Sequence, residues 1–179
     1  MPARDSLAVS DPPAGYAIEG YACLFDVPDL GRDLIERGAF SASLARQGAG
    51  GVRMLYQHDP AEPIGVWNDV IEDGRGLYVR GRLSPFVARA REVAALIRDG
   101  ALDGLSIGFK AVTARTDPRT RLRRIARIDL WEVSVVTFPM QPQARIARKT
   151  DDARIRRPAP SPAALLTAAA ARLRAAAGA

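Results

Sequence analysis

Apolar and polar residues alternate in several short stretches of the chain, a period of two that is typical of β-strands. Residues 16–25, YAIEGYACLF, carry apolar side chains at most positions of one parity. Residues 64–84 predict two strands joined by a hairpin turn at Asp73-Gly74-Arg75-Gly76. Further strands are predicted in residues 52–57, 104–112 and 121–139, with turns at 59–63, where two prolines interrupt the chain, and at 117–120.

Helical periodicity is clearest in residues 86–100, FVARAREVAALIRDG. Apolar residues recur there at a spacing of three and four, and Gly100 is placed to end the helix; the apolar positions are Phe86, Ala90, Val93, Ala94 and Ile97. A shorter helix is predicted in residues 38–48, with Ser41 as its N-cap and Gly48 as its stop. Because these helices do not alternate regularly with the strands, we expect an α+β fold around an antiparallel sheet or barrel.

The composition divides the chain into a body and a tail. We expect a flexible N-terminus in residues 1–15, one folded domain in 16–146, and a flexible basic tail rich in proline and alanine in 147–179. Of the net charge of +6, all lies in residues 145–179, which hold eight basic and two acidic residues. The body is therefore neutral overall, and its charge gives no reason to expect a nucleic-acid-binding face.

The numbers of cysteines and histidines and the lengths of the apolar runs exclude several kinds of site and segment. One cysteine, Cys23, cannot form an internal disulfide, and one histidine with one cysteine cannot form a zinc site of the Cys/His type. No run approaches the roughly 18 apolar residues of a transmembrane helix. The first residues lack the apolar segment of a signal peptide. We expect no cofactor, and no membrane or specific nucleic-acid partner.

The single histidine, His58, must be the base if this is a serine hydrolase of the histidine type. Ser106 lies in DGLSIGF beside glycines, where a hydroxyl can be exposed to a substrate, although a small polar residue on a strand would look the same. The other candidate nucleophiles have simpler interpretations. Capping or boundary roles suit Ser41, Ser43 and Ser84, and burial within a strand suits Ser134 and Cys23.

Two carboxylates in DLWEVSVV are candidates to orient the histidine. Asp129 and Glu132 differ in strand parity, so only one can face the site if the strand is unbroken. Glu132 interrupts an apolar run and needs a partner, which an arginine would also provide. Asp59 would point away from His58 and is expected to cap the turn.

Three segments in this order, LYQHDPAEPIG, DGLSIGF and DLWEVSVVTFPMQPQARI, resemble the signature blocks of the prohead (capsid maturation) proteases of HK97-type tailed phages. YACLFDVPDLGRDLIERGAF also resembles that family's N-terminal pattern. The resemblance covers residues 16–146. It implies a fold related to the herpesvirus assemblins, a small, mainly antiparallel β-barrel surrounded by short helices.

The resemblance also implies a serine endopeptidase with His58 as base, Ser106 as nucleophile and Glu132 as third member of the triad. The herpesvirus relatives use a second histidine as third member, which this chain lacks. The implied substrates are the scaffolding segment of the major capsid protein and, by self-cleavage, the protease itself; self-association is also implied. The implied location is the inside of an assembling prohead in the bacterial cytoplasm.

Two other classes remain open at this point. A metal hydrolase would have to build its site from His58 and carboxylates without any spaced motif. A non-enzymatic capsid scaffold or assembly protein would act through the basic tail. Loss of capsid processing on changing Ser106 separates the protease from both.

Overall fold

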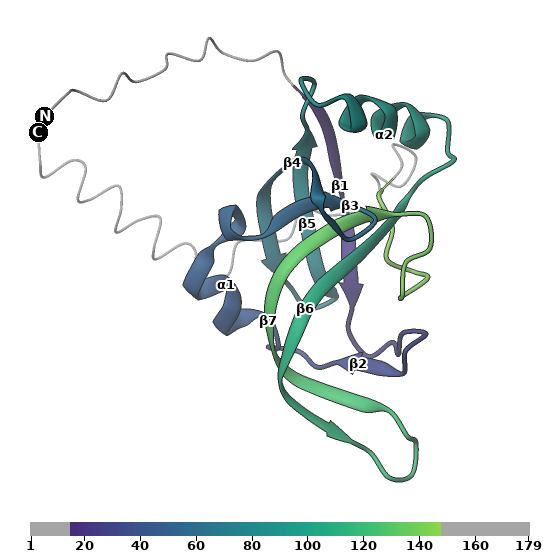
Figure 1. Cartoon of the computed structure of the whole chain (residues 1–179). Coiled ribbons are helices and arrows are strands. Elements are labelled where there is room, and N and C mark those ends of the chain that lie inside the picture. The colour runs from purple at the N-terminus through teal and green to yellow at the C-terminus, as the bar shows by residue number, and fades with distance from the viewer. Residues whose placement is uncertain (1–14, 148–179) are drawn as a thin grey trace, which may run out of the picture. The chain divides into compact units, whose positions relative to one another are not determined.

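Seven strands, two α-helices and one 3₁₀ turn make up residues 15–147, the part of the chain that the computed structural model describes (Figure 1). In chain order these elements are β1 (Tyr16–Leu24), β2 (Asp33–Ile35), α1 (Ser41–Gln47), η1 (Ala49–Gly51), β3 (Arg53–Tyr56), β4 (Asp59–Glu72), β5 (Gly76–Leu83), α2 (Ala88–Arg98), β6 (Gly104–Thr116) and β7 (Arg123–Val136). The predictions of a flexible N-terminus and a flexible tail concern residues outside this part, apart from Gly15 and Ala147.

The strands form one mixed sheet in the order β1-β5-β4-β3-β7-β2, with β6 paired to β7. Neighbours along β1-β5-β4-β3 are antiparallel, as are β6 and β7, whereas β7 runs parallel to both β3 and β2. The sheet curls into a half-barrel accompanied by two helices (Figure 1). The α+β prediction is therefore confirmed, but the expected barrel is a half-barrel with a mixed sheet. The parallel pairings join strands far apart in sequence, which strand periodicity does not reveal.

The end of the described chain spans the opening between β1 and β6. Ile146 bridges to Gly20 of β1, and Arg145 bridges to Gly104 of β6. Leu105 N donates to the Ala144 carbonyl at 2.9 Å, and Ala147 N donates to the Glu19 carbonyl at 2.8 Å. These bonds tie the two outer strands together through residues 144–147. The predicted domain limits, 16 and 146, stay a prediction.

Both helices form where the sequence predicts them, with differences at their starts. The buried face of α2 is formed by Ala90, Val93 and Ala94, and Gly100 follows it with a φ of +76°, a conformation that glycine adopts without strain. Phe86 precedes the helix and is exposed, so its assignment to the apolar face was wrong.

Helix α1 ends before Gly48, as predicted, and Gly48 has a φ of +63°. Ser41 is the first residue of this helix and not its cap, because its hydroxyl donates to Glu72 Oε2 on β4 at 2.9 Å. The predicted N-cap was therefore wrong: the Ser41 side chain bonds to another element and not to its own helix. No helix among residues 15–147 is long and apolar enough to cross a membrane.

Candidate active site

His58 lies in the tight turn that joins β3 to β4. Gln57 and His58 have φ values of +55° and +61°, and they are flanked by the paired residues Tyr56 and Asp59. Two successive positive φ values are the requirement of a type I′ hairpin turn. The turn was predicted at 59–63 instead. Residues 60–62 form an irregularity within β4 between the pairings of Asp59 and Pro63, because proline cannot continue the ladder.

This turn is held in a conformation that costs about 1–2 kcal/mol for each residue other than glycine. The end of β7 supplies the bonds that hold it. Gln57 N donates to the Val135 carbonyl at 3.0 Å, and Gln57 Nε2 donates to Thr137 Oγ1 at 2.6 Å. His58 N donates to Ser134 Oγ at 3.1 Å. The neighbouring strand therefore fixes the backbone of the histidine.

Glu132 of β7 is the carboxylate in contact with the imidazole. His58 Nδ1 lies 2.6 Å from Glu132 Oε1, and Ser134 Oγ donates to the other carboxylate oxygen at 2.7 Å. The Glu132 side chain is 11% exposed and that of His58 is 41% exposed. The hydrogen bond to Glu132 raises the pKa of His58 above its ordinary value, against the opposing effect of burial. The imidazole is thus oriented through Nδ1, which leaves Nε2 for another partner.

Asp129 binds elsewhere. Its carboxylate accepts from Trp131 Nε1 at 3.2 Å and forms an ion pair with Arg46. The hydrogen bond from Trp131 lowers the pKa of Asp129. Asp129 and Glu132 have opposite parity only in an unbroken strand. Gly108 pairs with Glu132 while Phe109 pairs with Leu130, so Trp131 is an extra residue in a β-bulge. The bulge places Asp129 and Glu132 on one face, yet only Glu132 reaches His58.

Ser106 lies on β6, the antiparallel neighbour of β7. It pairs with Ser134, and two residues further Gly108 pairs with Glu132. Directly opposed residues share a face with their Cβ atoms roughly 4.5–5.5 Å apart, so Ser106 and Glu132 lie on the same face. Among residues 15–147 the Ser106 hydroxyl makes no hydrogen bond, whereas His58 and Glu132 are in direct contact.

Gly108 makes room for this contact. A Cβ atom at this position would lie 1.9 Å from Glu132 Oε1, the same oxygen that meets His58. Any other residue would therefore displace the carboxylate.

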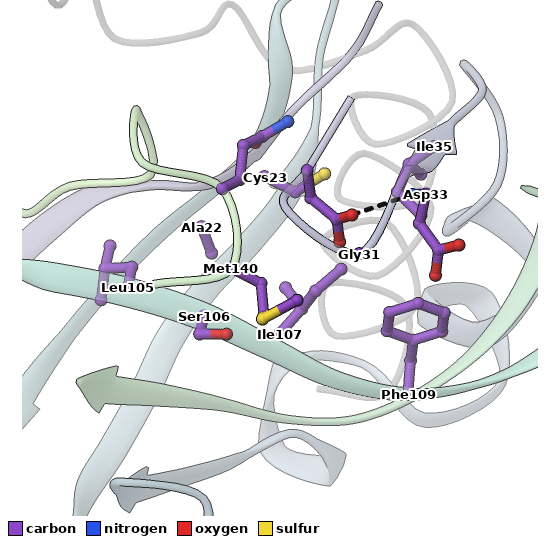
Figure 2. A pocket seen from close by; sticks show the side chains of 12 residues that line it. Ala22, Cys23, Gly31, Asp33, Ile35, Leu105, Ser106, Ile107, Phe109 and Met140 are labelled. Carbon is purple, nitrogen blue, oxygen red and sulfur yellow. Dashed lines mark hydrogen bonds between the residues drawn. The ribbon is translucent and has the colours of Figure 1, made fainter. Parts of the chain in front are cut away.

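A pocket of about 190 Å³ opens beside Ser106 (Figure 2). Most of its wall is apolar, and two aspartates and Gln141 add polar groups; the lining residues are Ala22, Cys23, Asp29, Gly31, Asp33, Ile35, Leu105, Ser106, Ile107, Phe109, Met140 and Gln141. Figure 2 shows Ser106 on one side of it and Asp33 and Phe109 on the other, with Met140 and Ile107 between.

Comparison with known proteins identifies the family. Residues 6–156 match the model of the Caudovirus prohead serine proteases. The chain belongs to this family. It is 40% identical over 134 residues to the prohead protease of Enterobacteria phage HK97, covering 72% of this chain and 58% of that protein. It is 34% identical over 86 residues to the prohead protease of Escherichia phage T5, covering 48% and 40%. The chain thus spans about half the length of these relatives.

Two solved structures share the fold of this prohead protease family member. The capsid assembly protease of bacteriophage T4 aligns with a TM-score of 0.54 at 17% identity, covering 71% of this chain and 91% of that one. The KSHV protease, solved with a hexapeptide phosphonate inhibitor, aligns with a TM-score of 0.53 at 14% identity, covering 79% and 74%. The half-barrel is therefore assemblin-like.

Two neighbours of the predicted site residues in this family member were not singled out from the sequence. Ser134 was interpreted as a buried hydroxyl, and it is fully buried, but it also bonds to both His58 and Glu132. The signal was present, since Ser134 follows Glu132 by two residues and so shares its face in a strand. Gly108 likewise follows Ser106 by two residues, so the two share a face of the strand.

Two other kinds of reactive group were considered from the sequence, the Cys23 thiol and side chains that could bind a metal ion. Burial raises the pKa of Cys23 to about 12, with smaller effects of Asp29 and Glu72, so the thiol stays protonated near neutral pH. In the described part of the chain, no group of three or more His, Cys, Asp or Glu side chains is arranged to hold a metal ion. An imidazole paired with a carboxylate, beside a strand that carries a serine, is an arrangement suited to acyl transfer.

Proposed function

We propose that this chain is a serine endopeptidase in which Ser106 is the nucleophile, His58 the general base and Glu132 the group that orients the base. The contact of 2.6 Å between His58 Nδ1 and Glu132 Oε1 is the observation that carries the proposal, within a chain of a serine protease family. The strand pairing of Ser106 with Ser134 supports it, because Ser134 is hydrogen-bonded to both His58 and Glu132.

The chemistry follows from these roles. With Nδ1 donating to Glu132, Nε2 of the neutral imidazole accepts the proton of Ser106 as the hydroxyl attacks the scissile carbonyl. His58 then gives this proton to the leaving amine, and an acyl group stays on Ser106. Water, activated by His58 in the same way, releases the acyl group. Glu132 stabilises the imidazolium that forms in both halves. The hydrogen bond between Ser106 and His58 forms when the substrate is bound, since such bonds are often long in the free enzyme.

We further propose that the substrates are the scaffolding segment of the major capsid protein and the chain itself, cleaved inside an assembling prohead in the bacterial cytoplasm. The family match and two relatives that are prohead proteases support this assignment. Self-association and self-cleavage belong to the same proposal.

Co-expression tests the proposal. The capsid protein is produced with the wild-type chain, with Ser106→Ala, or with Ser84→Ala as a serine control outside the site, and its intact mass is measured. We expect shortening with the wild type and with Ser84→Ala, and none with Ser106→Ala. Capsid protein that matures equally with Ser106→Ala would favour a scaffold or assembly protein instead.

A further inference from the structure

We propose that the pocket beside Ser106 is the specificity pocket, and that it takes the side chain of a lysine or arginine on the acyl side of the scissile bond. This inference rests on the proposed function, because it takes Ser106 as the nucleophile.

The position of the pocket assigns it to the acyl side. It is lined by residues of β1, the segment leading into and including β2, β6, and positions 140–141. None of its lining residues comes from the β3–β4 turn or from β7, the two elements that hold His58 and Glu132. The pocket and the imidazole therefore flank Ser106 from different elements. Since the base must protonate the leaving amine, the leaving-group side belongs to His58 and the acyl side to the pocket.

The size and wall of the pocket suit one extended side chain. Its volume of about 190 Å³ is smaller than the ~300–1,000 Å³ of pockets for drug-sized ligands. Between Ser106 and Asp33 the wall is apolar, formed by Ile107 and Met140 (Figure 2). Such a wall covers the methylene groups of a long side chain, while a charged head group needs a partner at the far end.

Asp29 and Asp33 supply that partner. Asp33 Oδ2 forms an ion pair with Arg123 Nη2 at 2.7 Å. Asp29 has no ion-pair partner among residues 15–147, and its Oδ1 accepts the backbone N–H of Asp33 at 2.8 Å. Two carboxylates face one guanidinium, so the pocket keeps a net negative charge. A lysine or arginine head group would pair with the second carboxylate, whereas an acidic side chain would be repelled.

The ionisation of Asp29 agrees with this assignment. Burial is the largest cause of a raised pKa at this carboxyl, with Asp33 adding to it and the Asp33 backbone hydrogen bond and Arg123 opposing it. Burying a carboxylate is costly, and a cationic substrate side chain would relieve that cost.

Two covalent probes test the pocket on the full chain. They are diphenyl phosphonates that differ only in their side chain, one carrying the aminobutyl group of lysine and the other the butyl group of norleucine. We expect the lysine reagent to modify Ser106 at least about tenfold faster, because its ammonium group makes a charge-assisted hydrogen bond that the butyl group cannot make. Asp29→Asn keeps the acceptor for the Asp33 N–H and should abolish the preference. Asp69→Asn, which removes a carboxylate paired with Arg80 on another strand, should retain it.

The results with the two reagents distinguish a wrong pocket assignment from a wrong nucleophile. Equal rates for the two reagents, a faster norleucine reagent, or an unchanged preference in Asp29→Asn would each contradict the pocket while leaving Ser106 as nucleophile. Absence of any adduct on Ser106 with either reagent would contradict the nucleophile, and the pocket assignment with it.

A second inference comes from the hydrogen bonds of Ser134. We infer that Ser134 is a positioning residue, which fixes the His58 backbone and the Glu132 carboxylate relative to each other. Its fully buried hydroxyl accepts from His58 N at 3.1 Å and donates to Glu132 Oε2 at 2.7 Å. One oxygen therefore joins the strained turn to the carboxylate. This inference also rests on the proposed function.

Ser43 is a matched control for Ser134. It is equally buried and its hydroxyl also binds β7, accepting from Leu130 N at 3.0 Å, but it does not touch His58 or Glu132. We expect Ser134→Ala to lower kcat by about tenfold to a hundredfold with little change in KM, because small misplacements of a base are costly. Ser134→Thr, which keeps the hydroxyl, should restore much of the loss.

Stability measured in parallel completes this test. Ser43→Ala and Ser134→Ala should both lower the unfolding midpoint, but only Ser134→Ala should lower kcat. Equal kcat in the two alanine variants, or a loss in Ser134→Thr as large as that in Ser134→Ala, would contradict the positioning role. If Ser106→Ala leaves peptide cleavage unchanged, the proposed nucleophile fails instead.

Discussion

His58 is the single histidine of the chain, so its imidazole can be followed by NMR without overlap from another one. The hydrogen bond to Glu132 raises its pKa, and we expect a midpoint above the ordinary value of about 6.5. The rate of cleavage should rise with pH over the same range, because only the neutral imidazole accepts the Ser106 proton. Glu132→Gln should move both midpoints to lower pH. A pH midpoint of the cleavage rate that differs from the midpoint of the NMR titration would contradict His58 as the base.

The same raised pKa fixes the sign of the effect on stability. A group whose pKa is higher in the folded state stabilises the fold fully below its unfolded pKa, and this contribution is lost as the pH rises through the folded pKa. The difference in unfolding free energy between wild type and Glu132→Gln should therefore shrink as the pH rises above about 6.5. Urea unfolding at a series of pH values measures it. A stability difference that grows as the pH rises would contradict a raised pKa of His58 in the folded state.

Gly108 offers a test of the carboxylate contact that leaves His58, Ser106 and Glu132 unchanged. In Gly108→Ala, the new Cβ would collide with Oε1, Cδ and Cγ of Glu132, so the carboxylate has to move away from His58. We expect the chain to fold and the cleavage rate to fall by about 10²-fold, the cost of a misplaced catalytic group. Gly50→Ala is the control, since nothing lies within 4 Å of a Cβ built there. Full activity in Gly108→Ala would show that the contact is dispensable.

The β3–β4 turn carries strain that can be measured. Gln57 has a φ of +55°, which glycine adopts freely and alanine does not. Both Gln57→Gly and Gln57→Ala lose the side-chain bonds to Thr137, so the two variants differ in backbone strain. We expect the glycine variant to be more stable by about 1 kcal/mol in urea unfolding, although the greater freedom of glycine in the unfolded chain reduces the difference. An alanine variant of equal or greater stability would contradict the strained turn.

The elements that the sequence predicts well are those with local causes. The hairpin turn at 73–76 is closed by Asp73, whose Oδ1 accepts from the backbone N–H groups of Arg75 and Gly76. The end of α2 follows from Gly100, which has a positive φ. The turn at Gln57-His58 lacks such a signature, and Pro60 and Pro63 direct the prediction to the wrong place. The bulge at Trp131 is equally hidden, because it shows only in the register with β6. Local patterns thus place the strands, whereas pairing between strands decides which side chains meet.

Residues 144–147 tie β1 to β6 across the opening of the half-barrel. A chain ending at Ala147 keeps all of these bonds, and one ending at Gln143 loses them. We expect the first to unfold at nearly the temperature of the full chain and the second at a clearly lower one, as measured by calorimetry. Equal midpoints would show that the bridge contributes little.

The residues beyond Ala147 are rich in arginine and lysine. We propose that they direct the enzyme into the prohead. Deleting residues 148–179 should leave cleavage of a peptide substrate intact and reduce the amount of enzyme found in particles, as measured by quantitative mass spectrometry. Equal losses of cleavage and incorporation would contradict this role for the tail.

In the proposed mechanism, Ser106 is a nucleophile activated by His58. Reaction with a fluorophosphonate, followed by intact-mass measurement and peptide mapping, tests it most directly. We expect one adduct on Ser106 in the wild type, none in Ser106→Ala, and much slower labelling in His58→Ala. An adduct of undiminished yield in Ser106→Ala, or one mapped to another serine in the wild type, would contradict it.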